Sequence, residues 1–256
     1  MAKIHEAAVQ GDIAEITNLL KGGFLGRPDV EAKDSNGMTA LHHAARHGRV
    51  EVVRLLLDKG ATVDAREQVG ITPLSLAASW GQVGVVQLLL ESGADVNALS
   101  STSWAPLHTV SSGEIAKALV DAGANVSAKA DDGRTPLHTS VIWSRVEVMR
   151  VLLDSGADVN AMDTQNCVPL HLAVKVIDTG PVRDFLRYSK VDPDDETTVL
   201  ASRIVRINAI TLLLEKGASV NVKDKAGKTA LQMARELREP VGLEAQNLLG
   251  RHGAAE

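Results

Sequence analysis

The sequence repeats itself along most of its length. A four-residue pattern close to Thr-Pro-Leu-His recurs with successive spacings of 33, 33, 30 and 33 residues. A period of roughly 20–50 residues is typical of solenoids, in which each unit packs only on its neighbours. We therefore expect a stack of small units and not one conventional core. The copies of the pattern are Thr39–His42, Thr72–Ser75, Ala105–His108, Thr135–His138 and Val168–His171.

One repeat, residues 34–66, predicts two short helices. A Thr at the helix N-cap and a Pro at the first helical position are favourable starts, so the motif is expected to open a first helix over residues 41–47. Residues 50–57 carry apolar side chains at i, i+3 and i+4, and Gly60 can end this second helix in the left-handed conformation. Residues 61–70 are polar and predict a turn or hairpin, which we call a finger.

These features resemble the ankyrin repeat family. The Thr-Pro-Leu-His motif, the leucine run Leu55–Leu57 and the later Gly93–Asn97 segment fall at the family's offsets, and the resemblance covers nearly the whole chain. It implies an all-α solenoid of about eight stacked helix-turn-helix units in a single domain spanning residues 1–256. The predicted units are an N-terminal cap at 1–33, repeats at 34–66, 67–99, 100–129, 130–162, 163–192 and 193–223, and a C-terminal cap at 224–256.

Four units depart from the family pattern, the first of them by an insertion over residues 24–28. The fourth is three residues short after His108, the sixth ends its second helix at Tyr188 without a Gly-Ala pair, and the seventh begins at Thr198 with Arg203 where a buried alanine is usual. We expect uneven stacking and crevices in these repeats, because shortened helices change the rotation between neighbouring units.

Composition narrows the classes of function. Aromatic residues make up only 2% of the chain, too few for the pockets of most cofactor enzymes, so we expect no cofactor. One cysteine cannot build a thiolate metal site, so we expect no metal. With 27 basic and 32 acidic residues the net charge is −5, which argues against nucleic acid as a partner. A lone cysteine, Cys167, indicates a reducing compartment. The start of the sequence lacks a signal-like apolar segment, and no long apolar run predicts membrane insertion, so an intracellular location, cytoplasmic or nuclear, is expected.

The resemblance also implies where a partner would bind. Ankyrin repeats usually bind on a concave face made of finger tips and the exposed side of the first helix. Two sets of positions fall there: the residue two before the Pro position, and the pair at the end of each first helix. Exposed tryptophans are frequent hot spots of interfaces, so we expect an apolar patch that binds a protein or peptide. The candidate partner-binding residues are Trp80, Trp104, Trp143, Ile71, Val69, Ile142, Arg134, Met38, His47 and Arg46, and Cys167 and Lys228 share the finger position.

Plainer roles remain open for several of these residues. Trp104 and Trp143 lie near the short fourth repeat and are alternatively expected to fill the gap that it leaves. The motif histidines His42, His108, His138 and His171 share one column, and the resemblance implies hydrogen bonding within and between repeats in place of metal ligation. His43 and His47 lie one turn apart and are expected on the surface.

Three asparagines in the finger turns, Asn97, Asn160 and Asn221, follow a leucine by eight residues. In this they resemble the preferred sites of asparaginyl hydroxylation in ankyrin repeats. A structural role, in which the side chain bonds local backbone at the turn, explains them equally well.

Two functions of different classes follow. The first is a non-catalytic interaction module that binds a protein or peptide on the concave face. The second is a small-molecule or catalytic pocket formed by the irregular repeats four to seven, with residues such as His108, Arg134, Trp143 and Asp178. Because no nucleophile is paired with a base in the sequence, we expect no enzyme, and a small molecule is the less favoured partner.

Overall fold

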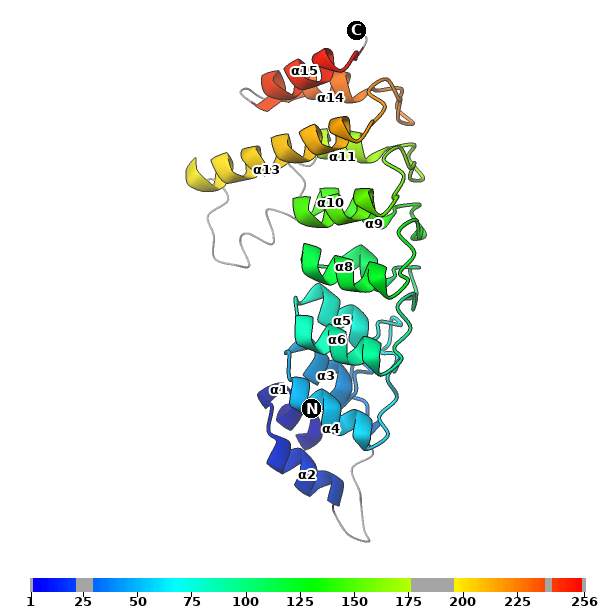
Figure 1. The fold of residues 1–256 in the computed structure, drawn as a ribbon, viewed down its shortest axis with the longest axis vertical. Helices are drawn as coiled ribbons and strands as arrows, with labels where there is room; N and C mark the ends of the chain where they lie inside the picture. The colour runs from blue at the N-terminus through cyan, green and yellow to red at the C-terminus, as the bar shows by residue number, and fades with distance from the viewer. Residues whose placement is uncertain (1, 22–29, 176–195, 238–240, 255–256) are drawn as a thin grey trace. The chain divides into compact units, whose positions relative to one another are not determined.

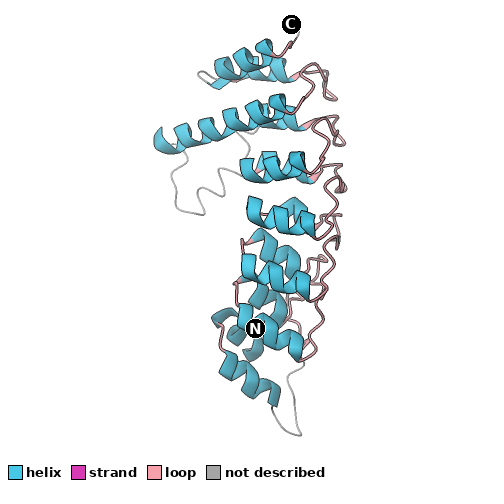
Figure 2. Cartoon of the chain, in the orientation of Figure 1, coloured by secondary structure: helices cyan, strands magenta, loops and turns pink. Residues whose placement is uncertain are grey.

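The structure, a computed structural model, describes residues 2–21, 30–175, 196–237 and 241–254. The described residues form helices joined by turns and loops, with no strand among them (Figures 1 and 2). The chain divides into two compact units, Met1–Asp131 and Asp132–Glu256, and the single domain expected from the sequence stays a prediction. No helix of the described part is both long and apolar enough to cross a membrane.

The described residues of the first unit form four helix pairs. The first helices α1, α3, α5 and α7 pack on one another in order, and the second helices α2, α4, α6 and α8 do the same. Each layer therefore buries its apolar face against the next, as the repeat pattern predicts. The helices are α1 (Lys3–Gln10), α2 (Ile13–Lys21), α3 (Ala40–Arg46), α4 (Val50–Asp58), α5 (Pro73–Ser79), α6 (Val83–Glu91), α7 (Pro106–Thr109) and α8 (Gly113–Asp121).

The second unit is built on the same scheme. Its first helices α9, α11 and α14 pack in order, and the second helices α10, α13 and α15 form the other row. Its helices are α9 (Pro136–Ile142), α10 (Val146–Asp154), α11 (Pro169–Lys175), α13 (Glu196–Glu215), α14 (Ala230–Glu236) and α15 (Val241–Arg251).

Aliphatic side chains and alanines fill the thin space between layers. Ala44 and Ala45 of α3 and Leu89 of α6 are fully buried, and no aromatic side chain belongs to the buried core of the described residues. Small residues on the first helices let neighbouring layers approach closely, which explains how so few aromatic residues suffice.

Repeat four is shortened in its first helix. Helix α7 has four residues, whereas α3, α5 and α9 have seven, as the missing residues predict. Immediately after α7, Ser111 donates from its backbone N–H and from its hydroxyl to the carbonyl oxygen of Ala78, at 3.1 and 2.9 Å. These bonds tie the shortened end of α7 to α5.

Residues 163–223 differ from the predicted division into two repeats. Helix α13 runs without a break through residues 196–215, where the prediction placed two helices and a turn, and it packs on α11. Asn160 bonds Gly217 and Ser219 directly, so these residues belong to the next layer of the stack. The structure thus pairs α11 with α13 in one layer. The predicted helix end at Tyr188 lies outside the described residues, and the other boundaries stay predictions.

Candidate interaction surface

The ends of α3 and α5 bring an arginine and a tryptophan together. Arg46 ends α3, and Trp80 follows α5 one layer later. The guanidinium carbon of Arg46 lies 4.4 Å from the centroid of the Trp80 ring, within cation–π range. Trp80 is 51% exposed, Arg46 is half-buried and the neighbouring His47 is exposed. We call Arg46, His47 and Trp80 the helix-end cluster.

The finger positions are more buried than the sequence predicts. Val69 is exposed and Ile71 half-buried, but Met38 is only 9% exposed and Cys167 is buried, so their predicted exposure is wrong. The reason lies in the backbone. The carbonyl oxygens of Ile71 and Cys167 accept hydrogen bonds from His42 and His138 of the preceding layer, at 3.1 Å each. At Ile71 and Cys167 the backbone of this position therefore lies against the preceding layer.

Trp104 is half-buried in the first unit. Its ring lies 5.8 Å from that of His108, centroid to centroid, and its backbone N–H donates to the Ser100 hydroxyl at 3.1 Å. It thus offers only part of its indole to a partner.

Trp143 lies in the second unit, directly after α9. It is 37% exposed, with the Arg145 guanidinium carbon 5.6 Å from its ring centroid and a half-buried Ile142 before it. Arg134, in the finger before α9, pairs with Asp132 at 3.3 Å and with Asp163 at 4.0 Å. Because Trp80 and Trp104 belong to the other unit, one patch containing all three tryptophans stays a prediction.

The motif histidines connect the layers. His138 Nδ1 accepts from the Thr135 backbone N–H at 3.1 Å, so its Nε2 carries the proton that is donated to Cys167. His42 and His171 repeat this arrangement, and burial lowers the pKa of all three imidazoles. This confirms the predicted hydrogen bonding within and between repeats for His42, His138 and His171, and His108 accepts the corresponding bond within its repeat from the Ala105 N–H at 3.1 Å. No cluster of three or more metal-ligating side chains occurs among the described residues.

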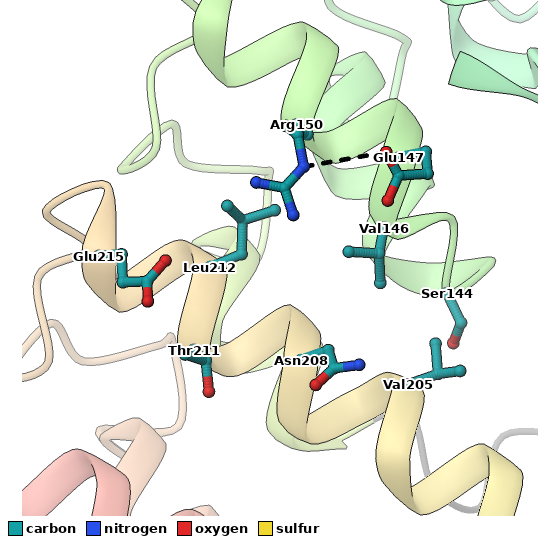
Figure 3. A pocket seen from close by; sticks show the side chains of 9 residues that line it. All are labelled: Ser144, Val146, Glu147, Arg150, Val205, Asn208, Thr211, Leu212 and Glu215. Carbon is teal, nitrogen blue, oxygen red and sulfur yellow. Dashed lines mark ion pairs between the residues drawn. The ribbon is translucent and has the colours of Figure 1, made fainter. Parts of the chain in front are cut away.

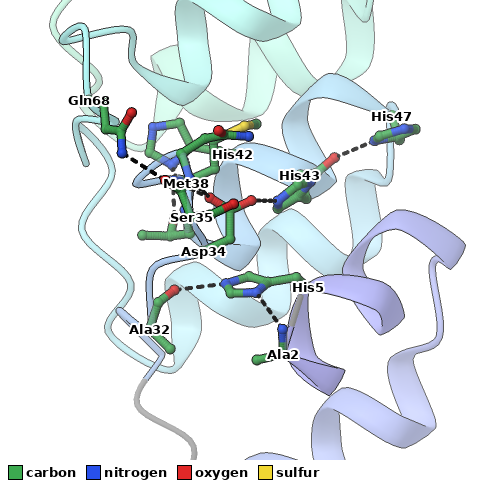
Figure 4. A network of polar contacts seen from close by, with 12 residues as sticks. Ala2, His5, Ala32, Asp34, Ser35, Met38, His42, His43, His47 and Gln68 are labelled. Carbon is green, nitrogen blue, oxygen red and sulfur yellow. Dashed lines mark hydrogen bonds and ion pairs between the residues drawn. The ribbon is translucent and has the colours of Figure 1, made fainter.

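A second polar network, which the sequence motif does not indicate, joins α1 to α3 (Figure 4). His43 is buried, contrary to prediction, and its Nε2 donates to Asp34 Oδ2 at 2.9 Å. His5 lies across the interface, 5.4 Å from His43 between ring centroids, and bonds the Ala32 carbonyl at 2.8 Å. Desolvation lowers the pKa of His43, although Asp34 opposes this effect. His5 is the third residue of α1, as the motif histidine His42 is of α3. This shared position is the sequence signal that could have predicted its role.

The finger-turn asparagines form hydrogen bonds with the backbone of the next layer, and not only with local backbone. Asn97 Nδ2 donates to the Gly123 carbonyl at 3.1 Å, and its Oδ1 accepts from the Asn125 N–H at 2.8 Å. Asn160 makes the corresponding bonds, and Asn221 donates to Gly253. The leucines that precede them, Leu89, Leu152 and Leu213, are fully buried.

A pocket of about 530 Å³ opens between α10 and α13 of the second unit (Figure 3). Arg150 and Glu147 form an ion pair at 3.8 Å on its α10 side. Of the residues predicted for a pocket, His108, Arg134 and Trp143 do not line it, and Asp178 lies outside the described residues. The lining residues are Ser144, Val146, Glu147, Arg150, Val205, Asn208, Thr211, Leu212 and Glu215.

Comparison with known proteins identifies the family. A family model described as ankyrin repeats (3 copies) matches residues 4–100 and 97–163, more than half of the chain. The chain therefore belongs to the ankyrin-repeat family.

Solved ankyrin structures share the fold. The human ASB11 ankyrin repeat domain matches over 100% of both chains, with 24% identity and a TM-score of 0.74. The ankyrin repeat domain of Bcl-3, titled a unique member of the IkappaB protein family, matches over 98% of both chains, with 23% identity and a TM-score of 0.68. At this identity, the two likenesses establish the fold alone.

Curated relatives match a shorter segment. The human NAD-capped RNA hydrolase NUDT12 is 41% identical over 61 residues, which is 23% of this chain and 12% of that protein. A Caenorhabditis elegans homolog of transient receptor potential cation channel subfamily A member 1 is 42% identical over 59 residues, 23% of this chain and 4% of that protein. The chain thus matches only a small part of the length of these relatives.

Proposed function

We propose that this chain is a non-catalytic module that binds a protein or peptide on the concave face of its ankyrin stack. Ankyrin repeats are general protein-interaction modules, and the chain belongs to that family. The observation that carries the proposal is Trp80, a large side chain that is half exposed at a position that the fold does not need for its core. Large exposed apolar side chains mark interaction sites, and Trp is enriched among binding hot spots.

Each unit, taken by itself, carries candidate residues for binding. In the first, the helix-end cluster, Val69, Ile71 and the accessible part of Trp104 supply contact area. In the second, Trp143, Ile142 and Arg134 do so. Met38 is left out, because its side chain is buried. An intracellular partner is proposed, in keeping with the single cysteine of the chain.

A pull-down with quantitative mass spectrometry tests this proposal. The double variant Trp80→Ala plus Trp143→Ala is compared with wild type and with Ile13→Ala plus Leu243→Ala. The control variant also removes one exposed apolar side chain from each unit, on α2 and α15. We expect partners to be lost only with the tryptophans, while circular dichroism shows all three proteins folded. An unchanged partner set would contradict the proposed surface.

We also propose that Asn97, Asn160 and Asn221 accept asparaginyl hydroxylation. Their position in the finger turn and the buried leucine eight residues earlier support this proposal. Mass spectrometry of protein isolated from cells that contain an asparaginyl hydroxylase checks it. One added oxygen atom on peptides that contain these residues, absent from the Asn→Ala variants, is the expected result, and unmodified peptides would contradict it.

Small-molecule binding in the pocket between α10 and α13 is a second candidate. Its volume and its mixed lining, with Val146, Val205 and Leu212 beside polar side chains, suit a small polar ligand. A thermal-shift screen of metabolites against wild type and Asn208→Leu tests it. Stabilisation of wild type that the variant loses supports this function, and the absence of any stabilising compound argues against it.

A further inference from the structure

The guanidinium of Arg46 is oriented but has no acceptor. Among the described residues none accepts a hydrogen bond from its N–H groups, and its side chain is held by stacking on Trp80. The Arg46 carbonyl oxygen accepts from Gln82 Nε2 at 3.2 Å, which fixes the end of α3 against the turn between α5 and α6. The indole N–H of Trp80 also donates to no described residue. The Arg46 guanidinium and the Trp80 indole N–H are therefore neighbouring donors without an acceptor among the described residues.

The acidic side chains in the fingers of the same layers are already used. Asp34 accepts from His43 and from the backbone N–H groups of Asn36 and Met38, at 2.8–2.9 Å. Burial would raise the pKa of Asp34, but these hydrogen bonds outweigh it and hold the pKa below its ordinary value. Glu67 Oε1 accepts from the backbone of Val69 and Ile71. Neither carboxylate is available to neutralise Arg46.

The chemistry that completes such a site is a carboxylate beside an apolar group. A guanidinium fork binds carboxylate oxygens bidentately, and stacking on an aromatic ring fixes the fork beforehand, so that little side-chain entropy is lost on binding. Trp80 leaves half of its surface exposed beside that fork, for an apolar neighbour of the carboxylate.

We propose that the Arg46–Trp80 pair recognises an acidic peptide segment, in which an Asp or Glu carboxylate binds the Arg46 guanidinium and an adjacent apolar side chain packs on the Trp80 ring. This inference rests on the proposed function and specifies the chemistry of its partner. His47 lies beside the pair and has only its Nδ1 bound, to the His43 carbonyl at 2.9 Å, so its Nε2 is a further polar contact for the peptide.

The corresponding pair in the second unit differs. Arg145 lies farther from its tryptophan, at 5.6 Å, and it has another interaction within the protein. Burial lowers the pKa of Arg145. Because Arg145 already interacts within the protein, it is not assigned to partner binding. We assign the acidic partner to the first unit alone.

A random peptide library displayed on phage and panned against the full chain tests the proposal. Enriched peptides are synthesised, and their affinities for wild type, Arg46→Gln, Arg46→Lys, Trp80→Ala and Arg54→Gln are measured by fluorescence polarisation at two salt concentrations. Arg54→Gln is the matched control, because Arg54 is an exposed arginine on α4. We expect Asp or Glu next to an apolar residue to be enriched. We also expect affinity to fall about tenfold or more in Arg46→Gln and Trp80→Ala, partly return in Arg46→Lys, and stay unchanged in Arg54→Gln.

The other outcomes separate this proposal from the one on which it rests. Peptides that lose affinity in Trp80→Ala but keep it within about twofold in Arg46→Gln overturn the acidic partner and leave the proposed surface intact. Enriched peptides without acidic residues do the same. Peptides that bind both variants as well as wild type, or no enrichment at all, overturn both proposals.

Discussion

The imidazole of His138 connects two layers of the second unit by donating from Nε2 to the carbonyl oxygen of Cys167, 3.1 Å away. Its Nδ1 accepts the N–H of Thr135, so protonation would place a second proton where a donor already points. His42 and His171 are held in the same way, and burial lowers the pKa of each below 6.5.

The lowered pKa values of these three histidines predict that the folded chain loses stability at acidic pH. Because the folded-state pKa of each histidine lies below its unfolded value of 6.5, the unfolded chain binds more protons below that pH. Stability is therefore complete above pH 6.5 and is lost as the pH falls through the folded-state pKa values. Urea unfolding between pH 7.5 and 5 measures the loss, and a midpoint independent of pH would contradict it.

His138→Gln separates titration from hydrogen bonding. The natural stack provides the precedent, since Gln232 occupies this position in α14 and accepts from the Thr229 N–H at 3.0 Å. We expect the variant to cost about 0.5–1.5 kcal/mol at pH 7.5, through loss of the bond to Cys167, and to reduce the slope of stability with pH. An unchanged slope would show that His138 does not titrate on unfolding.

Two turn positions with positive φ predict opposite effects. Gly81 has a φ of 75°, and the corresponding turn after α9 places Ser144 at a φ of 54°. Because left-handed backbone costs a non-glycine residue about 1–2 kcal/mol, Gly81→Ala should destabilise and Ser144→Gly should stabilise by up to about 1 kcal/mol. Thermal unfolding of both variants measures the effects, and shifts of the same sign would contradict the assignment.

Trp80 and Leu89 should differ sharply in their effect on stability. Leu89 of α6 is fully buried, so Leu89→Ala should cost about 2–5 kcal/mol. Trp80→Ala removes a half-exposed ring and a cation–π contact worth about 0.5–1 kcal/mol. Chemical denaturation measures the free energy of unfolding of both variants. Equal losses would mean that Trp80 is a core residue and not a surface for binding.

The hydrogen bonds of Asn160 predict a larger loss of stability in Asn160→Ala than in Asn160→Asp. Its Oδ1 accepts from the Ser219 N–H at 2.7 Å, and its Nδ2 donates to the Gly217 carbonyl at 3.4 Å. Asn160→Ala removes both bonds and should cost about 1–2 kcal/mol, whereas Asn160→Asp keeps the acceptor and should cost less. Urea unfolding measures the free energy of unfolding of the two variants and so ranks them. Should Asn160→Asp prove the more destabilising, the weaker donor bond would be the one that matters.

The sequence predicted the stack well where the motif is regular. Thr135, Pro136 and His138 specify the start of a helix through local capping, which needs no knowledge of the neighbouring layer, and α9 begins there. Burial of the finger positions was missed for the opposite reason. It depends on carbonyl oxygens that accept bonds from the preceding layer, as at Cys167, and a repeat read alone does not contain this information.

The layer built from α11 and α13 is a second feature that the repeat pattern alone does not predict. Its motif at Pro169 and its closing Gly217 are both regular, but they lie too far apart for a single standard repeat. Spacing alone therefore favoured two repeats. The packing of α11 on α13 and the bonds from Asn160 to Gly217 and Ser219 place these helices in one layer, which the spacing does not reveal.

Site-specific photo-crosslinking tests the central claim most directly. A photoreactive amino acid is placed at His47, in the helix-end cluster, or at Arg54, on the exposed side of α4. Both variants are irradiated with a partner recovered from the pull-down. Covalent capture from position 47 and not from position 54 is the result that we predict. Capture from position 54 alone, or equally from both positions, would contradict a binding surface at the ends of the first helices.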